Sequence, residues 1–194
     1  MADPIVIDPG PEERARRKAL SQWMTDPKLA ERVVAWAGPL EGKYVLEPAC
    51  GTGNLARAAR AAGADVTTID IDPVFKPEHV GDYRKVEFGG RFNLAITNPP
   101  YEDGLELDFL EKLAADAEEV VAVVRVNALT GQKRHARLWK HVTVTGLAFL
   151  VARPSFKLVD EDMGSPQHDF CVVRYQLFTN PNTIIRPPEW WTWP

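Results

Sequence analysis

Cysteine is scarce in this sequence, and the spacings that mark disulfide frameworks or zinc sites are missing. The 194 residues include two cysteines, Cys50 and Cys171, which lie far apart and form no C-x-x-C pair. The four histidines show no metal-ligand spacing. We therefore expect no metal site and no disulfide framework, and the default compartment is a reducing, cytoplasmic one.

Long apolar runs and a strong basic charge are also missing. No apolar run approaches the length of a membrane span, and the N-terminus has no signal-peptide layout, so we expect no membrane association. The net charge is −4, so the overall charge does not indicate nucleic-acid binding. Local basic patches at residues 14–18 and 133–140 could contact phosphates, and a solvated face explains each of them equally well.

By composition the chain has three parts. Residues 1–22 form a loose arm with prolines, followed by a basic helix that begins near Glu12. Residues 23–178 carry strands and helical stripes, and we expect them to form a single domain. Residues 179–194 are a tail rich in proline and tryptophan with no helical or strand period. We expect its tryptophans to pack on the outside of the domain, with an exposed patch for a partner as the alternative.

The central part has the pattern of an α/β protein. Helices are expected to begin at Pro27, capped by Asp26 or Thr25, at Asn54 and near Leu105. A weak or broken helix is expected between residues 73 and 90, and a basic helix or loop over 129–140. Apolar runs predict strands over residues 43–46, 64–69, 92–97, 119–126, 142–151 and 170–178.

A glycine-bearing turn follows the first of these strands. The strand runs directly into E-P-A-C-G-T-G at residues 47–53, a helix begins at Asn54, and the next strand ends at Asp70. This is the opening unit of a nucleotide-binding doubly wound sheet. An acid at the tip of the second strand can accept hydrogen bonds from a ribose diol. Because the run lacks G-x-G-x-x-G, it suits a sulfonium nucleoside, which has no phosphate to seat on the helix N-terminus.

A proline-stiffened turn follows the strand over residues 92–97. It consists of Asn98, Pro99, Pro100 and Tyr101. The prolines fix φ and donate no hydrogen bond, so the turn is rigid and its carbonyls stay free. The Asn98 side-chain oxygen and the Pro99 carbonyl can accept from an NH2 group, while Tyr101 stacks on the ring that bears it. A turn with Tyr101 as a buried anchor is the alternative.

Together, these two turns resemble the motifs of the class I S-adenosylmethionine-dependent methyltransferases, and within them the DNA methyltransferases of the adenine-N6 type. The cofactor motif precedes the catalytic motif, which is the gamma-like order. W-M-T-D-P at residues 23–27 resembles the N-terminal motif that closes over the methionine end of the cofactor. The resemblance spans about residues 20–178. It implies a Rossmann-like, seven-stranded, mostly parallel doubly wound sheet with an antiparallel last strand.

The resemblance also implies roles for individual residues, with S-adenosyl-L-methionine as the cofactor. The implied cofactor-binding residues are Thr25 at the methionine carboxylate, Glu47 near the amino group, Ala49, Gly51 and Gly53 along the cofactor, Asp70 at the ribose with Asp72 as second choice, Asp82 at the adenine, and Asn98. The implied catalytic residues are Asn98, Pro99, Pro100 and Tyr101. The expected substrate contacts are Tyr101 and Phe156 on either side of the base, with Lys133, Arg134, Arg137 and Lys140 at the phosphates.

These roles imply direct methyl transfer to the N6 amine of adenine in DNA, with nucleic acid as the partner. RNA adenine methylation is the nearest alternative, and protein glutamine methylation is the next, because the same acceptors would hold a carboxamide. A module that binds the cofactor and regulates a partner without catalysis is the non-enzymatic alternative. We expect no room in this chain for a separate target-recognition domain, so three alternatives stay open: weak specificity, recognition by residues 157–169, or recognition by a partner. Each of the methyl-transfer alternatives requires the glycine-bearing turn and the proline-stiffened turn to open onto one pocket.

Overall fold

The computed structural model describes residues 24–101, 104–151, 154, 168–177 and 187–192. The expected helix near Glu12, Phe156 and most of the polar segment over 157–169 lie outside the described residues. In chain order the elements are α2 (Pro27–Ala37), β1 (Tyr44–Glu47), α3 (Asn54–Ala61), β2 (Asp65–Asp70), η1 (Pro73–Phe75), β3 (His79–Val80), η2 (Tyr83–Lys85), β4 (Phe92–Thr97), α4 (Leu105–Asp116), β5 (Ala117–Arg125), η3 (Val126–Leu129), α5 (Gln132–Arg134), the π-helical turn η4 (His135–Trp139), β6 (Thr143–Leu150), β7 (Phe170–Gln176) and β8 (Glu189–Trp191).

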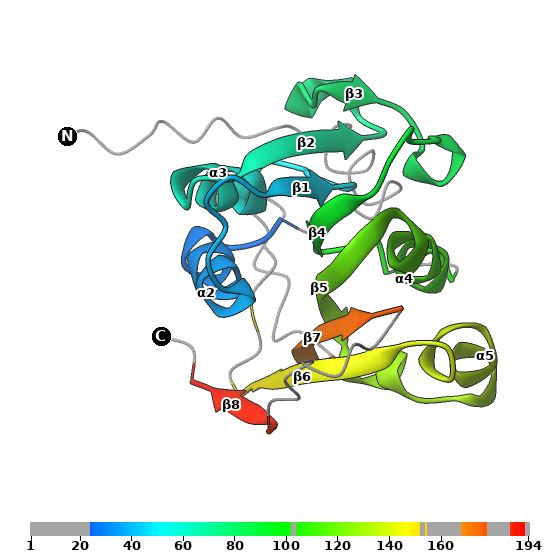
Figure 1. Ribbon diagram of the computed structural model, residues 1–194. Helices are drawn as coiled ribbons and strands as arrows, with labels where there is room; N and C mark the ends of the chain where they lie inside the picture. The colour runs from blue at the N-terminus through cyan, green and yellow to red at the C-terminus, as the bar shows by residue number, and fades with distance from the viewer. Residues whose placement is uncertain (1–23, 102–103, 152–153, 155–167, 178–186, 193–194) are drawn as a thin grey trace, which may run out of the picture.

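The strands form one mixed sheet in the order β3-β2-β1-β4-β5-β7-β6-β8 (Figure 1). The pairs from β3 to β5 are parallel, and β7 runs antiparallel to both β5 and β6. This confirms the mostly parallel, doubly wound α/β fold with an antiparallel strand. The expected count of seven strands was wrong by one, because β8 pairs in parallel with β6 at the edge of the sheet. A strand of three residues is too short to show a period in the sequence.

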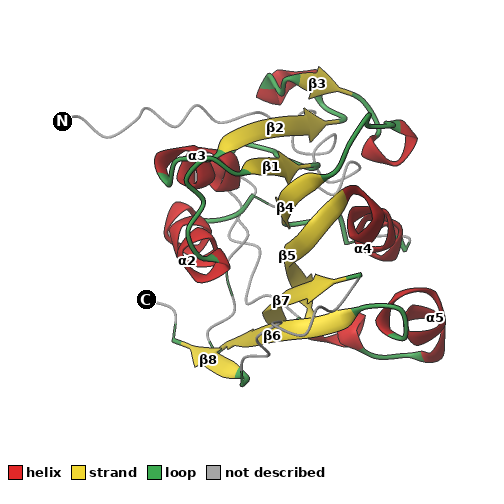
Figure 2. Cartoon of the chain, in the orientation of Figure 1, coloured by secondary structure: helices red, strands yellow, loops and turns green. Residues whose placement is uncertain are grey.

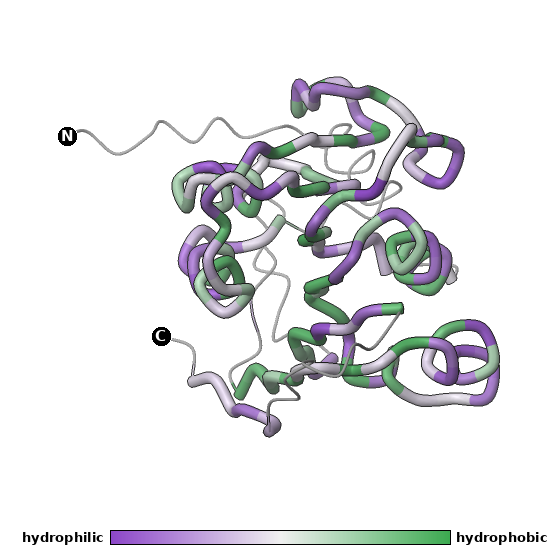
Figure 3. The backbone as a smooth tube through the Cα atoms, viewed as in Figure 1, coloured by the Kyte–Doolittle hydropathy of each residue, from purple (hydrophilic) through white to green (hydrophobic). Residues whose placement is uncertain are grey.

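Helices cover both faces of the sheet (Figure 2). α2 and α3 lie on one face, whereas α4 lies on the other. The residues of β5 alternate between the two buried layers: Val121 and Val123 belong to the core under α2 and α3, while Val120 and Val124 belong to the core under α4. A central strand buried on both faces reads as a continuous apolar run, and Figure 3 shows such apolar segments in the middle of the sheet.

The start of α2 was predicted with two candidate caps, and Asp26 is the one used. Its carboxylate accepts from the backbone N–H groups of Lys28 at 2.8 Å and Leu29 at 3.4 Å, and Pro27 occupies the first turn. Thr25 therefore does not cap the helix, and it lines the cleft described below. No helix among the described residues has the length and apolar character to cross a membrane.

The segment between β2 and β4 contains no full helix, as expected. It forms the 3-10 turns η1 and η2 with the short edge strand β3 between them. Asp72 caps η1 through Val74 N–H at 3.1 Å, and Asp82 caps η2 through Arg84 N–H at 3.1 Å. These short elements bring residues 81–84 to the same edge of the sheet as the ends of β1 and β4.

The C-terminal strand β8 packs against α2 and is hydrogen-bonded to it. Trp191 is 3% exposed and meets Trp36 edge to face, with ring centroids 5.7 Å apart. The Glu189 carboxylate accepts from both indole N–H groups, each at 2.9 Å. The Arg32 guanidinium lies 4.6 Å from the centre of the Trp191 ring, while Trp190 stays 66% exposed. Part of the tail therefore completes the core beside α2.

This packing predicts that Gly146 in β6 cannot carry a side chain. A Cβ at Gly146 would lie 2.8 and 2.9 Å from two ring carbons of Trp36, and that ring is held by Glu189 and Trp191. We expect Gly146→Ala to lower the free energy of unfolding by about 1–3 kcal/mol, the usual cost of overpacking, measured by urea denaturation. Gly90→Ala is the control because a Cβ there meets nothing within 4 Å. Equal stabilities for the two variants would contradict this account.

Candidate functional site

The glycine-bearing turn and the proline-stiffened turn open onto one cleft. The cleft lies at the carboxyl ends of β1, β2 and β4, the edge at which open α/β sheets bind ligands. Residues from the N-terminal side of α2 close one side of it, and residues of α4 line another. Its lining residues are Met24, Thr25, Glu47, Pro48, Ala49, Cys50, Gly51, Thr52, Asn54, Leu55, Asp70, Ile71, Gly81, Asp82, Tyr83, Arg84, Asn98, Pro100, Leu105 and Phe109.

The turn after β1 is shaped by hydrogen bonds to the end of β2. Cys50 N–H donates to the Ile69 carbonyl at 3.0 Å, and Gly51 N–H donates to Asp70 Oδ2 at 2.8 Å. Gly51 has φ +49°, and a Cβ there would lie 3.0 Å from the Met24 sulfur. The positive φ favours glycine at this position, and a Cβ would also require the Met24 side chain to shift. Gly53 begins α3 with φ +75° and is not among the lining residues.

Asp70 lines the cleft, and its carboxylate already accepts two backbone hydrogen bonds. Its two oxygens accept from the N–H groups of Gly51 at 2.8 Å and Asp72 at 2.9 Å. Each carboxylate oxygen can accept more than one bond, so capacity remains for a diol. Burial raises the pKa of Asp70. Asp72, the second choice for the ribose, is 1% exposed and is not among the lining residues.

Glu47 is the most deeply buried acid that lines the cleft. It is 2% exposed, and its Oε2 atom has no hydrogen-bond partner among the described residues. Burial raises the pKa of this carboxyl well above its ordinary value, and the nearby Asp70 raises it further. An N–H or ammonium group of a ligand would satisfy this acceptor.

Thr25 and Asn98 join the two ends of the cleft. Asn98 Nδ2 donates to Thr25 Oγ1 at 3.2 Å, and Asn54 Nδ2 donates to the Thr25 carbonyl at 2.6 Å. The Thr25 hydroxyl still has its own proton to donate, so a carboxylate in the cleft could accept it. The segment before α2 and the turn after β4 are therefore linked directly.

Tyr101 differs from the expectation of an exposed stacking surface. The residue is 5% exposed and is not among the lining residues. Its ring packs against Phe170, with centroids 5.4 Å apart, and its hydroxyl donates to Asn98 Oδ1. Pro99 is also buried without lining the cleft, while Pro100 lines it. The ring is thus an internal anchor in this structure.

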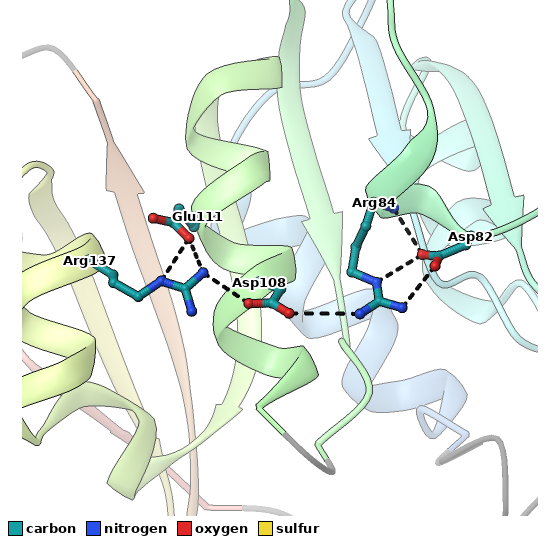
Figure 4. A network of polar contacts seen from close by, with 5 residues as sticks. All are labelled: Asp82, Arg84, Asp108, Glu111 and Arg137. Carbon is teal, nitrogen blue, oxygen red and sulfur yellow. Dashed lines mark hydrogen bonds and ion pairs between the residues drawn. The ribbon is translucent and has the colours of Figure 1, made fainter.

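Asp82 lines the cleft as expected, but Arg84 occupies much of its carboxylate. Asp82 Oδ1 accepts from Arg84 Nε at 3.0 Å and Oδ2 accepts from its terminal nitrogen at 2.8 Å. This pairing lowers the pKa of Asp82. Arg84 also reaches Asp108 of α4 at 3.7 Å. Figure 4 shows Asp108 between Arg84 and Arg137.

Arg137, expected at a phosphate, instead faces acids of α4 in this structure. Its guanidinium donates to Asp108 Oδ1 at 2.9 Å and to Glu111 Oε2, as Figure 4 shows. The sequence did not reveal this contact because both acids lie more than 25 residues before Arg137. Lys133 is exposed and Arg134 half-buried, beyond the carboxyl end of β5, and neither lines the cleft.

Several cleft residues were not anticipated. Met24 lies against Gly51, Asn54 holds Thr25, and Arg84 binds Asp82, while Leu105 and Phe109 form the wall from α4. Asn54 directly follows the glycine-bearing turn, and Arg84 lies two residues after Asp82, so proximity to these predicted residues was a usable signal. Leu105 and Phe109 are apolar residues of α4, and nothing local distinguishes a cleft wall from a core.

Cys50 is a small turn residue and not a nucleophile. Burial raises its pKa to about 12, helped by Glu47 and Asp70, so the thiol stays protonated near neutral pH. Cys171 is also a free, buried thiol. Within the described part of the chain no group of three or more His, Cys, Asp or Glu side chains could hold a metal ion.

Comparison with curated proteins finds two kinds of relative, and no family model matches the chain. The chain is 32% identical over 106 residues to the Type II methyltransferase M.TthHB8I of Thermus thermophilus, covering 50% of this chain and 25% of that protein. It is 45% identical over 56 residues to ribosomal RNA small subunit methyltransferase A of Novosphingobium aromaticivorans, covering 28% and 20%. The chain thus spans a quarter or less of the length of these relatives.

Solved structures with the same fold cover most of the chain. A Listeria monocytogenes protein described as a class I S-adenosylmethionine-dependent methyltransferase matches with a TM-score of 0.65 and 14% identity, over 93% of this chain and 72% of that one. The M protein of the type I restriction enzyme EcoKI matches with a TM-score of 0.65 and 13% identity, over 91% and 48%. At these identities the likeness concerns the fold.

The burial of Glu47 predicts a pH-dependent contribution to stability. Because its pKa is raised in the folded state, the folded chain holds this proton more tightly than the unfolded chain. The resulting stabilisation is complete below the ordinary pKa of 4.5 and is lost as pH rises through the raised value. We expect the stability of the wild type, relative to Glu47→Gln, to fall as the pH rises above the ordinary pKa of 4.5 and to level off above the raised pKa, measured in denaturation experiments.

The same pair of proteins tests the ligand role of Glu47. Above the pH at which this stability difference levels off, S-adenosylmethionine should raise the melting temperature of the wild type more than that of Glu47→Gln, because only the wild type then offers a carboxylate to the ammonium group. Equal shifts would remove Glu47 from the binding site, and a pH-independent stability difference would contradict the raised pKa.

Proposed function

We propose that this chain, which has the fold of the class I S-adenosylmethionine-dependent methyltransferases, transfers a methyl group to the N6 amine of adenine in DNA. The observation that carries the proposal is the shared cleft. Asn98 and Pro100 line it together with the glycine turn, Glu47 and Asp70. A donor nucleoside on the glycine turn and an amine at Asn98 would therefore meet.

The residues of the cleft fit the cofactor expected for this fold. S-adenosylmethionine supplies an electrophilic methyl group on a sulfonium. Glu47 offers an unpaired buried oxygen to its ammonium group, and Asp70 offers remaining acceptor capacity to its diol. The missing side chain at Gly51 leaves room for close approach of the backbone. Asp82 would accept from the adenine amine, and the Thr25 hydroxyl would donate to the methionine carboxylate.

The chemistry assigned to Asn98 is that of an acceptor. An amine attached to an aromatic ring is a poor nucleophile because its lone pair is delocalised into the ring. Acceptance of an N–H bond by Asn98 Oδ1, which belongs to a residue that lines the cleft, would favour tetrahedral geometry at nitrogen and localise that lone pair. Positioning both reactants in one cleft then contributes up to about 7–11 kcal/mol in ideal cases.

DNA is the first choice of substrate, and RNA is the second. Support for DNA comes from the motif pair and from the likeness to M.TthHB8I and to the EcoKI M protein. Support for RNA comes from the relative that is a ribosomal RNA methyltransferase. Lys133 and Arg134 would contact phosphates in either case. A base in a duplex must leave the stack, at a cost of a few kcal/mol.

Removal of the Asn98 side chain tests the acceptor role. We expect Asn98→Ala to lower the rate of methyl transfer by about 100-fold or more, as misplaced reactants generally do, while S-adenosylmethionine still binds in a calorimeter. Asn127→Ala, at an exposed position outside the cleft, is the control and should keep its activity. Turnover of Asn98→Ala at the control rate would refute the acceptor role.

The substrate class can be read from the transfer of labelled methyl groups. Duplex DNA, single-stranded RNA and a protein mixture are offered in parallel with the labelled cofactor, and the methylated base is identified after digestion. We expect N6-methyladenine in DNA. Label in RNA alone would favour the second choice, and label in protein alone would end the nucleic-acid proposal.

A further inference from the structure

We infer that Arg84 is a positioning residue for the cofactor, because its guanidinium holds the Asp82 carboxylate in the direction that accepts a hydrogen bond from the adenine amine of S-adenosylmethionine. This inference rests on the proposed function, which pairs that amine with Asp82. It assigns to Arg84 an action through a neighbouring side chain, with no contact to the reacting atoms.

The backbone on both sides of Asp82 is held by other parts of the chain. Gly81 N–H donates to the Asp70 carbonyl at 2.9 Å, which ties the segment to the end of β2. On the other side, Tyr83 is 1% exposed, and its hydroxyl donates to Asp116 Oδ2 at 2.7 Å. These contacts set the position of the backbone, so only the direction of the carboxylate remains to be fixed.

Arg84 restricts that direction with three hydrogen bonds. Asp82 Oδ1 accepts from the backbone N–H of Arg84 at 3.1 Å and from its Nε at 3.0 Å, while Oδ2 accepts from a terminal guanidinium nitrogen at 2.8 Å. The guanidinium is thus a fork of two N–H donors that grips both oxygens and opposes rotation of the carboxylate. A carboxylate has about four acceptor positions, so one remains on Oδ2, and no other described residue donates to it.

A second carboxylate compensates the charge of Arg84 from the opposite side. Asp108 of α4 lies 3.7 Å from a terminal nitrogen of Arg84, so the guanidinium lies between Asp82 and Asp108 (Figure 4). Arg84 and Asp82 both line the cleft, where the other charged lining residues, Glu47 and Asp70, are acids. A guanidinium placed between two carboxylates is suited to orient one of them, and less suited to receive an anionic group of a ligand.

The pairing also determines what the carboxyl group can bind. The hydrogen bonds from Arg84 lower the pKa of Asp82, so this group stays ionised and can only accept. A purine with an amine at C6 donates to such a group, whereas a purine with hydrogen at C6 offers nothing to it. Arg84 should therefore matter for ligands that carry the amine and be irrelevant for ligands that lack it.

Arg84→Lys tests the inference because lysine keeps the positive charge but cannot form the fork. We expect the calorimetric affinity for S-adenosylmethionine to fall roughly fivefold to tenfold, about the size of one hydrogen bond. The affinity for the analogue that carries purine in place of adenine should stay unchanged. In turnover, KM for the cofactor should rise with kcat unchanged, as for a contact that is the same in the ground and transition states. Equal losses for both ligands, or no loss for either, would overturn the inference.

Arg137→Lys is the matched control for this substitution. Its guanidinium also pairs with Asp108, at 2.9 Å, and its side chain is 35% exposed against 39% for Arg84. Arg137 is not among the residues that line the cleft, so this variant should bind both ligands as the wild type does. A loss of affinity equal to that of Arg84→Lys would show a general effect of disturbed ion pairs at α4 and would contradict the inference.

A double-mutant cycle separates an action through Asp82 from a direct contact with the ligand. In an Asp82→Ala background, Arg84→Lys should weaken S-adenosylmethionine no further, because the fork has no carboxylate to hold. Losses that add in the double variant would mean that Arg84 acts on the ligand by itself, and the inference would fall.

These binding measurements need no methyl acceptor, so they separate the inference from the proposed function. If the wild type does not bind S-adenosylmethionine, the proposed function fails and the inference fails with it. If the wild type binds the cofactor and Asn98→Ala is inactive, while Arg84→Lys binds like the wild type, only the inference fails. If Arg84→Lys behaves as expected and Asn98→Ala is fully active, the acceptor role of Asn98 fails and the cofactor contact stands.

Discussion

The parallel pairing of β1 with β2 and β4 is the constraint on which the cleft depends. Leu46 lies opposite Thr67 on one side and opposite Ala95 on the other, so the three strands end at one edge. The turns that follow them must therefore face each other. The Gly51 N–H bond to Asp70 then fixes the first turn against the end of the second strand, and Asn98 reaches Thr25 across the same edge.

Buried acids determine what this cleft can accept. Glu47 and Asp70 both have raised pKa values because they are buried, and Arg84 is already engaged by Asp82. A ligand that brings an ammonium group and a diol would satisfy acceptors that the protein leaves open. A phosphate would face these carboxylates instead, which agrees with the absence of a G-x-G-x-x-G run. The proposed cofactor, a cationic nucleoside, matches this charge and burial better than a nucleotide would.

Contacts from distant segments also fix the turn after β4. The prolines at positions 99 and 100 stiffen the backbone locally, but the direction of the Asn98 amide depends on Thr25 and Tyr101. Arg125 holds Tyr101 from the next strand. Two other segments of the chain therefore hold the turn: the segment before α2 through Thr25, and the end of β5 through Arg125.

The sequence by itself determined the alternation of strands and helices, the glycine turn, the start of α2 and the rigid turn after β4. These features follow from local rules: side-chain period, proline φ and the need for glycine where φ is positive, as at Gly51. Only the tertiary structure decided that Tyr101 turns inward, that Arg137 pairs with α4 and that β8 adds a strand. Tyr101 packs on Phe170, Arg137 pairs with Asp108, and β8 pairs with β6. These partners lie far away in the chain, so local sequence patterns cannot predict the contacts.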